Sequence, residues 1–573
     1  SASLDQLAAD ATQDLVSQGV SAERIVVVRR VHLRYDGTDS ALVVLAGTIA
    51  EMQSAFDAEY LKRYSFLMQQ RELIVEAASV EAIGSGATAA ESTHATVPRS
   101  ARLAAKATAR MYSEGQWRDT PLYARDEMRR GDVIGGPAII AEANATTVVE
   151  PDWEAIVTEF NHMVLERTRP RVAKQAIGTD ADPIMLEVFN NLFMSIAEQM
   201  GLRLQNTAYS VNIKERLDFS CALFDSAGNL IANAPHMPVH LGSMSESIKT
   251  VMRENAGTMK PGDAYAINDP YHGGTHLPDV TVITPVFDRA GVEILFYVGS
   301  RGHHADIGGT TPGSMPPFST SLDEEGTRFI NFKLVEGQGI NQAGRICEAE
   351  LMTLLTSGAY PARNPQQNLA DLRAQIAANE KGREELLRMV EQFGLDVVRA
   401  YMQHVQDNAE ESVRRVITRL KDGEFDYKLD NGALIRVRIE VDREDRSATI
   451  DFTGSSNQLP NNFNAPSAVC YAAVLYVFRT LVDSDIPLNA GCLKPLHVVI
   501  PERSMLNPRY PAAVVAGNVE TSSCITDTLY GALGVMAAAQ GTMNNFTFGN
   551  ERYQYYETIS GGSGAGIYNV GAS

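Results

Sequence analysis

The sequence has 573 residues, with 50 Lys and Arg against 70 Asp and Glu, so its formal net charge is −20 and its pI is near 5.1. This acidic balance argues against a nucleic-acid-binding surface, which needs basic patches for phosphates. The length allows several domains. A content of 44% hydrophobic and 21% charged residues is ordinary for a globular protein.

The five cysteines lie far apart and form no Cys-x-x-Cys pair, which argues against a disulfide framework or a thiolate zinc site. No apolar run reaches the ~18 residues that a membrane helix needs, and no signal peptide is visible at the start of the sequence. We therefore expect reduced thiols, a cytoplasmic location and no association with a membrane or with nucleic acid.

Residues 1–166 predict a mixed α/β unit that ends in a small β-sandwich or barrel. Residues 167–182 have the composition of a linker. The elements expected in the first unit are helices over 4–19 and 51–64 and strands over 24–35, 42–45, 72–83, 138–141 and 146–150.

Residues 183–573 predict a β-rich core interrupted by a long helical insertion. Asp182 and Pro183 form a good helix start, as an N-cap followed by proline at the first position. Apolar stripes over about 364–420 predict two helices, broken near Gly394. The other elements expected are a helix over 183–199, strands and loops over 200–345, a hairpin over 434–441 and 448–452, and a helix over 468–482. The fold class is thus mixed α/β and multidomain.

Six of the eleven histidines fall within residues 236–304, in three short clusters rich in Pro and Gly. We expect all three clusters to lie on tight loops rather than inside helices. The clusters are His236 with His240, His272 with His276 and Asp279, and His303 with His304 and Asp306. Imidazole and carboxylate together are usual ligands of a borderline divalent metal, although scattered core or surface histidines would give the same residues.

His276 and Asp279 are three residues apart on a loop that Pro278 stiffens, and His303 and His304 follow an apolar strand. A strand-loop-strand arrangement would bring these loops together. Two His and one Asp leave positions open for water or substrate, as a catalytic metal requires. The candidate ligands are His276, Asp279 and one of His303 and His304, and Mn, Zn or Fe would all suit them.

Other polar residues of this region are candidates for catalysis or for substrate binding. Asp269 is a fourth metal ligand, a residue that orients the ring of His276 by a hydrogen bond, or part of an ordinary turn. Arg216 and Asp218 lie in a run of charged residues, which by default is a solvent-exposed surface. The functional alternative is that the Arg216 guanidinium binds a substrate carboxylate, for which arginine is the usual receptor. The candidates are Asp269, His272 and His304 for catalysis and Arg216, Asp218 and Arg301 for substrate binding.

Several long strings of this sequence resemble the hydantoinase B family over about residues 182–566. They include Lys214-Glu-Arg-Leu-Asp-Phe-Ser220, Asn268-Asp-Pro-Tyr-His-Gly-Gly-Thr-His-Leu-Pro-Asp279, Arg301-Gly-His-His-Ala-Asp306 and Val515-Ala-Gly-Asn-Val-Glu-Thr521. Residues 1–166 resemble the C-terminal end of the hydantoinase A family, notably at Gly135-Gly-Pro-Ala-Ile-Ile-Ala141. An A portion joined to a B portion is the arrangement of the ATP-dependent 5-oxoprolinase family.

The resemblance implies the hydrolysis of 5-oxo-L-proline to L-glutamate, coupled to ATP cleavage, with Mg²⁺ serving the nucleotide. It implies a hydantoinase B-type core and a homodimer, and a divalent metal held by His276, Asp279 and His303. In that family an actin-like ATPase in the A portion phosphorylates the amide oxygen. The phosphate loops of such lobes are not found here, so an N-terminal hydantoinase A portion is the partner that the resemblance implies.

Three other functions share parts of these patterns. A hydantoinase or N-methylhydantoinase component opens a different ring by similar chemistry, and a ketone carboxylase component uses a related metal site. A structural fragment with non-catalytic histidine clusters is the non-enzymatic alternative. An Arg placed for a substrate carboxylate favours the 5-oxoprolinase, and a bound metal separates the three enzymes from the fragment.

The isolated chain should fold but show no ATPase and no 5-oxoprolinase activity, because phosphoryl transfer needs a phosphate cradle and a Mg²⁺ site. The measurement is a coupled ADP-release assay with and without 5-oxo-L-proline, repeated after addition of the hydantoinase A portion, which should restore activity. Substrate-dependent ADP release by the chain alone would show that it contains a nucleotide site.

Overall fold

The computed structural model describes most of the chain and divides it into two compact units. The described residues are 2–36, 41–64, 67–68, 71–84, 99, 102–113, 115–169, 178–233, 237–339, 344–483, 486–543, 545–550, 553–559, 561–565 and 570–571. His236 and half of the predicted linker, residues 170–177, lie outside them. One unit comprises Ser1–Arg29 with Ser79–Ile177, and the other comprises Arg30–Ala78 with Gly178–Ser573. The units therefore interleave along the chain, and the predicted domain limits stay a prediction.

The first unit contains a two-sheet β structure whose apolar core includes Ile134, Ile140 and Val149. One sheet has the order β4-β5-β7-β8 and the other β10-β9-β6. The elements are α1 (Ala2–Ser17), β4 (Ala107–Ser113), β5 (Gln116–Ala124), β6 (Val133–Gly135), β7 (Ala138–Ala141), β8 (Thr146–Val149), β9 (Trp153–Val157) and β10 (Met163–Arg167).

Three further strands form a small sheet of order β2-β1-β3, as the alternating apolar residues of this region predict. Helix α2 packs on strand β2, and its Phe56 and Tyr60 rings lie edge-on to Tyr35. The elements are β1 (Ile25–Tyr35), β2 (Leu42–Leu45), α2 (Ile49–Tyr64) and β3 (Leu73–Gly84).

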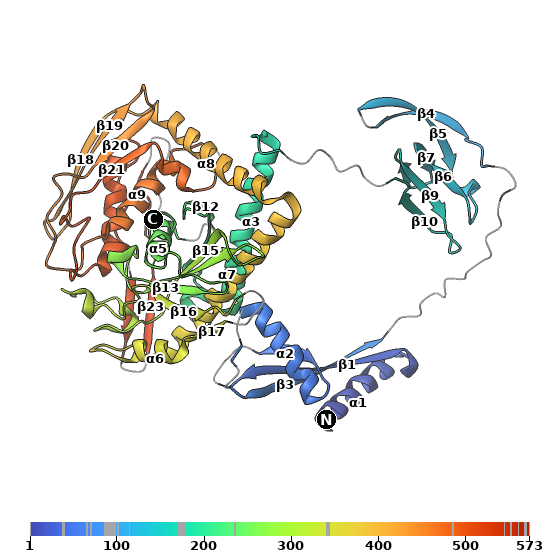
Figure 1. The fold of residues 1–573 in the computed structure, drawn as a ribbon, viewed down its shortest axis with the longest axis horizontal. Coiled ribbons are helices and arrows are strands. Elements are labelled where there is room, and N and C mark those ends of the chain that lie inside the picture. Colours follow the sequence, from blue (N-terminus) through green and yellow to red (C-terminus); the bar gives the residue numbers. More distant parts are fainter. Residues whose placement is uncertain are drawn as a thin grey trace. The chain divides into compact units, whose positions relative to one another are not determined.

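A seven-stranded sheet of order β12-β11-β15-β14-β13-β16-β17 forms the centre of the second unit (Figure 1). Its strands are β11 (Phe219–Phe224), β12 (Leu230–Asn233), β13 (Ala264–Ile267), β14 (Asp279–Phe287), β15 (Ile294–His303), β16 (Phe332–Glu336) and β17 (Arg345–Ile346). All six residues of β11 and all ten of β15 but the first are buried, because helices cover the sheet.

Helices α5 (Pro238–Glu254) and α7 (Pro365–Phe393) both pack on strands β14 and β15. Helix α3 (Pro183–Thr207) packs along α7, and its N-cap is Asp182, which accepts the backbone N–H groups of Ile184 and Met185. The neighbouring helices are α4 (Val211–Lys214), α6 (Glu348–Thr356) and α8 (Leu395–Ile417).

Amide side chains of α7 fix the two central strands. Gln375 donates to the carbonyls of Val280 and Ser300 at 2.9 and 3.0 Å, and Asn379 donates to Val282 O at 2.9 Å. Because the amides are fully buried, these bonds carry more weight than exposed ones and hold β14 and β15 against the helix.

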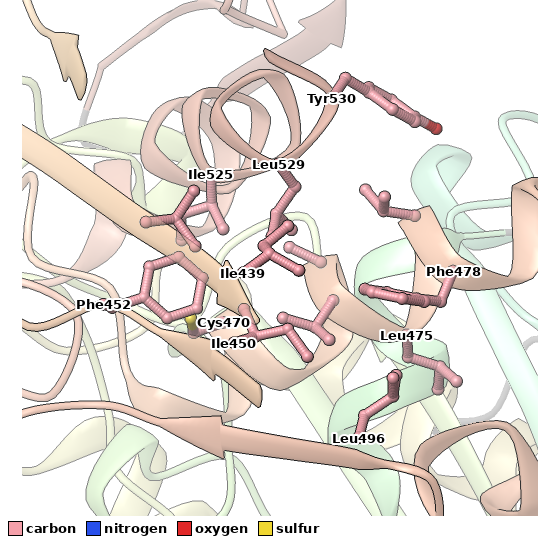
Figure 2. Packing of buried hydrophobic residues seen from close by; sticks show 14 of the residues in the cluster. Ile439, Ile450, Phe452, Cys470, Leu475, Phe478, Leu496, Ile525, Leu529 and Tyr530 are labelled. Carbon is pink, nitrogen blue, oxygen red and sulfur yellow. The ribbon is translucent and has the colours of Figure 1, made fainter. Parts of the chain in front are cut away.

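A second, four-stranded sheet of order β18-β19-β20-β21 packs against α9 (Ser467–Thr480) and α10 (Ser522–Leu533). Figure 2 shows this core, where Ile439 and Ile450 from the sheet, with Phe452 directly after β20, lie near Ile525 and Leu529 from α10. The strands are β18 (Gly423–Lys428), β19 (Leu434–Asp442), β20 (Ser447–Asp451) and β21 (Leu496–Val499), and a separate hairpin consists of β22 (Asn545–Gly549) and β23 (Gln554–Thr558).

The mixed α/β, multidomain fold class is confirmed. The break between α7 and α8 falls at Gly394, whose φ of 86° favours glycine. The expectation that all three histidine clusters lie on loops is wrong, because His240 lies in the first turn of α5, His272 ends a 3-10 helical turn (Pro270–His272), and His303 is the last residue of β15. Pro238 occupies an N-terminal position of α5, where proline is tolerated, so it begins the helix that it seemed to exclude. Within the described residues, no helix is both long and apolar enough to cross a bilayer.

Candidate metal centre

Strand pairing brings the three predicted metal ligands together. Strand β14 begins at Asp279 and β15 ends at His303, and the antiparallel register places these residues opposite each other. His276 stands three residues before Asp279, on the loop that enters β14. One ligand atom from each of the three residues lies within 4.8 Å of the others, and all three side chains are buried. The strand-loop-strand arrangement expected from the sequence is therefore present.

The loop before β14 is shaped by close packing of its backbone. A side chain at Gly274 would approach the carbonyl oxygen of Asn268 to 2.2 Å, so this position admits only glycine. The amide of Asn268 donates to Leu277 O at 2.7 Å and accepts from Phe329 N at 2.6 Å. These contacts fix the stretch that carries His276.

Asp279 is the centre of the cluster. Its Oδ2 lies 2.9 Å from His276 Nδ1, and its Oδ1 lies 3.2 Å from His240 Nε2 and 3.5 Å from His303 Nδ1. Thr275 also donates its hydroxyl to Oδ2 at 2.7 Å. Three imidazoles thus surround one fully buried carboxylate.

The surroundings shift the pKa values of these groups in different directions. Burial by itself would raise the pKa of Asp279, but attraction to His276 and His240 outweighs it and holds that pKa well below its usual value. Burial lowers the pKa of His276. Burial also opposes protonation of His303, yet Asp218, 3.7 Å away, raises the pKa of this residue. These shifts favour the anionic form of Asp279 and the neutral imidazole of His276, which are the forms that bind a metal.

Several buried polar atoms in the cluster lack hydrogen bonds. Asp279 Oδ1, His276 Nδ1 and Asn518 Oδ1 have no hydrogen-bond partner among the described residues. His276 Nδ1 is close to Asp279 without hydrogen-bond geometry. Buried polar atoms are rarely left in this state, so the cluster has the donor set and the unused lone pairs that a divalent metal takes.

The structure adds residues that we did not select from the sequence. His240 reaches Asp279 from α5, and its Nδ1 lies 3.2 Å from the hydroxyl of Ser220 on β11. Asn518 lies 3.4 Å from both His276 Nε2 and Asp279 Oδ2. The first histidine cluster pointed to His240, and the string Val515–Thr521 contains Asn518, but neither signal showed which residue would reach the site.

Arg216 and Asp218 lie beside the cluster. Asp218 is paired with His303, as described above, and the positive charge of Arg216 acts on the same imidazole. The Arg216 guanidinium lies over the ring of Tyr555 at 5.4 Å, and its Nη1 has no hydrogen-bond partner in the described part of the chain. A side-chain hydrogen bond also joins Arg216 to Tyr555, so Nη1 is the part of the guanidinium that lacks a partner there.

The remaining predicted residues have their polar atoms engaged by other groups. Arg301 is fully buried and donates from Nε to Thr281 at 2.7 Å, from Nη2 to Ser247 at 2.8 Å, and to Ser243. The two ring nitrogens of His304 contact Asn368 at 3.0 Å and Gln375 at 3.2 Å. Both residues hold the sheet to α5 and α7.

Asp269 and His272 form a pair outside the cluster. Asp269 Oδ1 lies 3.0 Å from His272 Nδ1, and its Oδ2 accepts from Arg328 Nε at 2.7 Å. Asp269 is fully buried, whereas His272 is half-buried and lines a cavity of about 510 Å³. The structure thus brings His276, Asp279 and His303 together and places Arg216 and Asp218 beside them. The other four predicted residues, Arg301, His304, Asp269 and His272, make contacts outside the cluster.

The chain belongs to the hydantoinase B/oxoprolinase family, whose model matches residues 182–573. Residues 1–168 match the hydantoinase/oxoprolinase C-terminal domain. This family assignment confirms the resemblance inferred from the sequence.

Curated relatives match almost the whole chain. It is 42% identical to 5-oxoprolinase 1 of Arabidopsis thaliana over 97% of this chain and 45% of the relative. It is 40% identical to the 5-oxoprolinase of Saccharomyces cerevisiae over 98% of this chain and 46% of the relative. The chain thus spans less than half the length of these relatives.

The fold also resembles solved structures. The ATP-dependent caprolactamase of Pseudomonas jessenii superposes with a TM-score of 0.56 and 25% identity, over 66% of each chain. An acetone carboxylase has the same TM-score at 17% identity over 68% of this chain and 55% of its own, which shows a shared fold alone.

Replacing His276 with Ala should remove most of the bound metal, because it deletes one of three candidate ligands. Replacing His240 with Ala should weaken metal affinity by about 10–100-fold, since His240 orients Asp279 without being needed as a ligand. The measurement is elemental analysis of the purified chain, followed by titration of the metal-free protein with Mn²⁺ and Zn²⁺.

The matched control is His497→Ala, which removes an exposed histidine of β21 and should leave metal content unchanged. Equal metal content in His276→Ala and the unmodified chain would contradict the assignment of the cluster.

Proposed function

We propose that this chain is the hydantoinase B-containing part of an ATP-dependent 5-oxoprolinase, which opens 5-oxo-L-proline to L-glutamate. The observation that carries the proposal is the buried cluster of His276, Asp279 and His303, in which Asp279 Oδ1 and His276 Nδ1 have no hydrogen-bond partner among the described residues. Curated relatives that match this chain over nearly its whole length bear the name 5-oxoprolinase, which supports this substrate.

We assign His276, Asp279 and His303 as ligands of a divalent metal, with Mn, Zn and Fe all compatible with the donor set. Such an ion supplies a Lewis acid for a carbonyl oxygen and lowers the pKa of a water molecule. His240 keeps the Asp279 carboxylate in place from one side, and Asp218 holds the His303 ring from the other. Asn518 is close enough to orient an oxygen of the substrate or of water at the same site.

Arg216 is the residue that we assign to the substrate carboxylate. Its Nη1 has no hydrogen-bond partner among the described residues, it stands next to His303, and a guanidinium binds a carboxylate through two parallel hydrogen bonds. Asp218 lies two residues further along the chain and ties the start of β11 to the cluster by accepting His303 N at its backbone oxygen. The carboxylate of 5-oxoproline would thereby lie close to the metal site.

The amide of a five-membered lactam is stable, so the ring opening needs activation by ATP. We propose that a hydantoinase A portion binds ATP with Mg²⁺ and phosphorylates the amide oxygen, and that this chain handles the activated ring. The curated relatives are more than twice as long as the segment that this chain matches, which leaves room for such a portion.

We also propose a homodimer in the cytoplasm. Two-fold dimers are the commonest soluble assemblies, and all five cysteines are buried free thiols, which suits a reducing compartment.

The complete enzyme should form glutamate and ADP from 5-oxo-L-proline, and Asp279→Asn should reduce glutamate formation by about 100-fold or more because it removes the charge that the cluster is built around. Glutamate is measured by chromatography and ADP by a coupled assay. Loss of glutamate formation should accompany loss of metal in the same sample.

The substrate panel in this assay includes hydantoin, N-methylhydantoin and a ketone with bicarbonate. The chain is 30% identical to a D-/L-hydantoinase component of a Pseudomonas strain, over 68% of this chain and 68% of that relative, which makes hydantoin the main competitor. Turnover of hydantoin without turnover of 5-oxo-L-proline would replace the proposed function by a hydantoinase.

Arg216→Lys in the complete enzyme should raise KM for 5-oxo-L-proline by about ten-fold or more, since a charged, bidentate hydrogen bond contributes ~1.5–3 kcal/mol. The measurement is steady-state kinetics with a fixed, saturating ATP concentration. The control Arg443→Lys changes an exposed arginine of the β19–β20 turn and should leave KM unchanged. Unchanged kinetics for Arg216→Lys would assign Arg216 to an internal pairing instead.

A further inference from the structure

A second cavity of about 630 Å³ is lined in part by the residues that follow Asn518 in the chain, and we call it the hairpin pocket. Four segments form it: a Pro- and Gly-rich loop, the loop that carries Asn462 and Phe463, the chain around a π-helical turn (Gly517–Thr521), and strand β22 of the C-terminal hairpin. Its lining residues are Thr311, Pro312, Met315, Pro316, Pro317, Asn462, Phe463, Val515, Ala516, Val519, Glu520, Phe546, Thr547, Phe548 and Gly549.

Buried polar contacts hold two walls of the hairpin pocket in place. Asn462 donates to Pro316 O at 2.8 Å and so fixes the Pro-rich loop. The fully buried Glu325 accepts the backbone N–H groups of Val514 and Val515 at 3.0 and 3.1 Å, which fixes the chain leading into the π-helical turn. The cavity is thus preformed, as small-molecule sites generally are.

The π-helical turn joins this pocket to the metal centre. Val519 and Glu520 line the pocket, while Asn518 from the same turn contacts His276 and Asp279. Short π-helical segments are rare and occur often at functional sites. A ligand in the pocket would touch the same short turn that reaches the candidate metal ligands.

The hairpin makes a second connection. Phe548 pairs with Tyr555 across the hairpin, and their rings stack at a centroid distance of 4.9 Å. Tyr555 in turn lies under the guanidinium of Arg216, the cation whose Nη1 lacks a hydrogen bond to any described residue. An aromatic surface therefore runs from the pocket wall to the cation beside His303.

We propose that the hairpin pocket binds the ring of the cyclic amide and that Phe546 and Phe548 determine which rings are accepted. This inference rests on the proposed function and names the site where its substrate is recognised. The aromatic rings and Val519 provide apolar contacts for the methylene face of a lactam, and Glu520 provides an acceptor for the ring N–H. The described lining residues include no lysine or arginine, so the substrate carboxylate turns towards Arg216 at the end of the aromatic surface.

The test measures the binding of two probes, 5-oxo-L-proline and the neutral lactam 2-pyrrolidinone, by saturation-transfer NMR. The chain is loaded with Zn²⁺ in place of Mn²⁺, because Zn²⁺ is diamagnetic. The double variant Phe546→Ala, Phe548→Ala should bind both probes about ten-fold more weakly or worse, because it removes the aromatic contacts to the lactam ring. Arg216→Lys should weaken 5-oxo-L-proline alone. Tyr553→Ala is the matched control, since Tyr553 precedes β23, is 73% exposed and is not a lining residue.

A second variant, Met315→Trp, fills the pocket without changing the hairpin and should also weaken both probes. Unchanged affinity in the double variant and in Met315→Trp would overturn the pocket assignment, while the proposed function would stand. If the unmodified chain binds neither probe but binds hydantoin, the proposed substrate is wrong, and the same variants then show whether the pocket binds that ring. Absence of binding for every cyclic amide would overturn both proposals.

Discussion

A single buried carboxylate, Asp279, is the constraint around which this region is arranged. A charge without solvent contact is costly unless it is paired or bound to a metal. Asp279 has none of its surface exposed and meets His276, His240 and His303, which come from a loop, a helix and a neighbouring strand. The anion thereby fixes the mutual positions of β14, β15 and α5.

The surrounding framework limits how far this cluster can relax. Gln375 and Asn379 of α7 hold the backbone of β14 and β15, and Arg301 binds hydroxyl groups of α5 from the other direction. Arg301 has no carboxylate among these bonded partners, and burial lowers its pKa to about 10. The attraction of Asp279 for Arg301 opposes this decrease, so the arginine also balances the buried anion. Rigid strands with buried side-chain hydrogen bonds can position metal ligands accurately.

The secondary structure followed from sequence wherever periodicity was strong. The helices on both sides of Gly394, the hairpin β19–β20 and helix α9 were all predicted close to their observed limits. Helix α5 was missed, because Pro238 and Gly242 within its sequence are typical of loops. Gly242 is needed there because a side chain would approach the backbone of Ala472 in α9 to 2.4 Å, a contact between residues far apart in the chain.

The sequence by itself determined the acidic, mixed α/β character of the chain, its family, and the choice of His276, Asp279 and one of His303 and His304 as candidate metal ligands. Local signals suffice for these, because periodicity and the His276-Leu-Pro-Asp279 spacing are carried by neighbouring residues. Tertiary structure alone decided that His240 and Asn518 reach Asp279 and that Arg216 meets Tyr555. It also decided that His304 bonds to α7 and that Arg301 bonds to α5. Those contacts join residues tens to hundreds of positions apart, and only the packing of the sheet, the helices and the hairpin sets them.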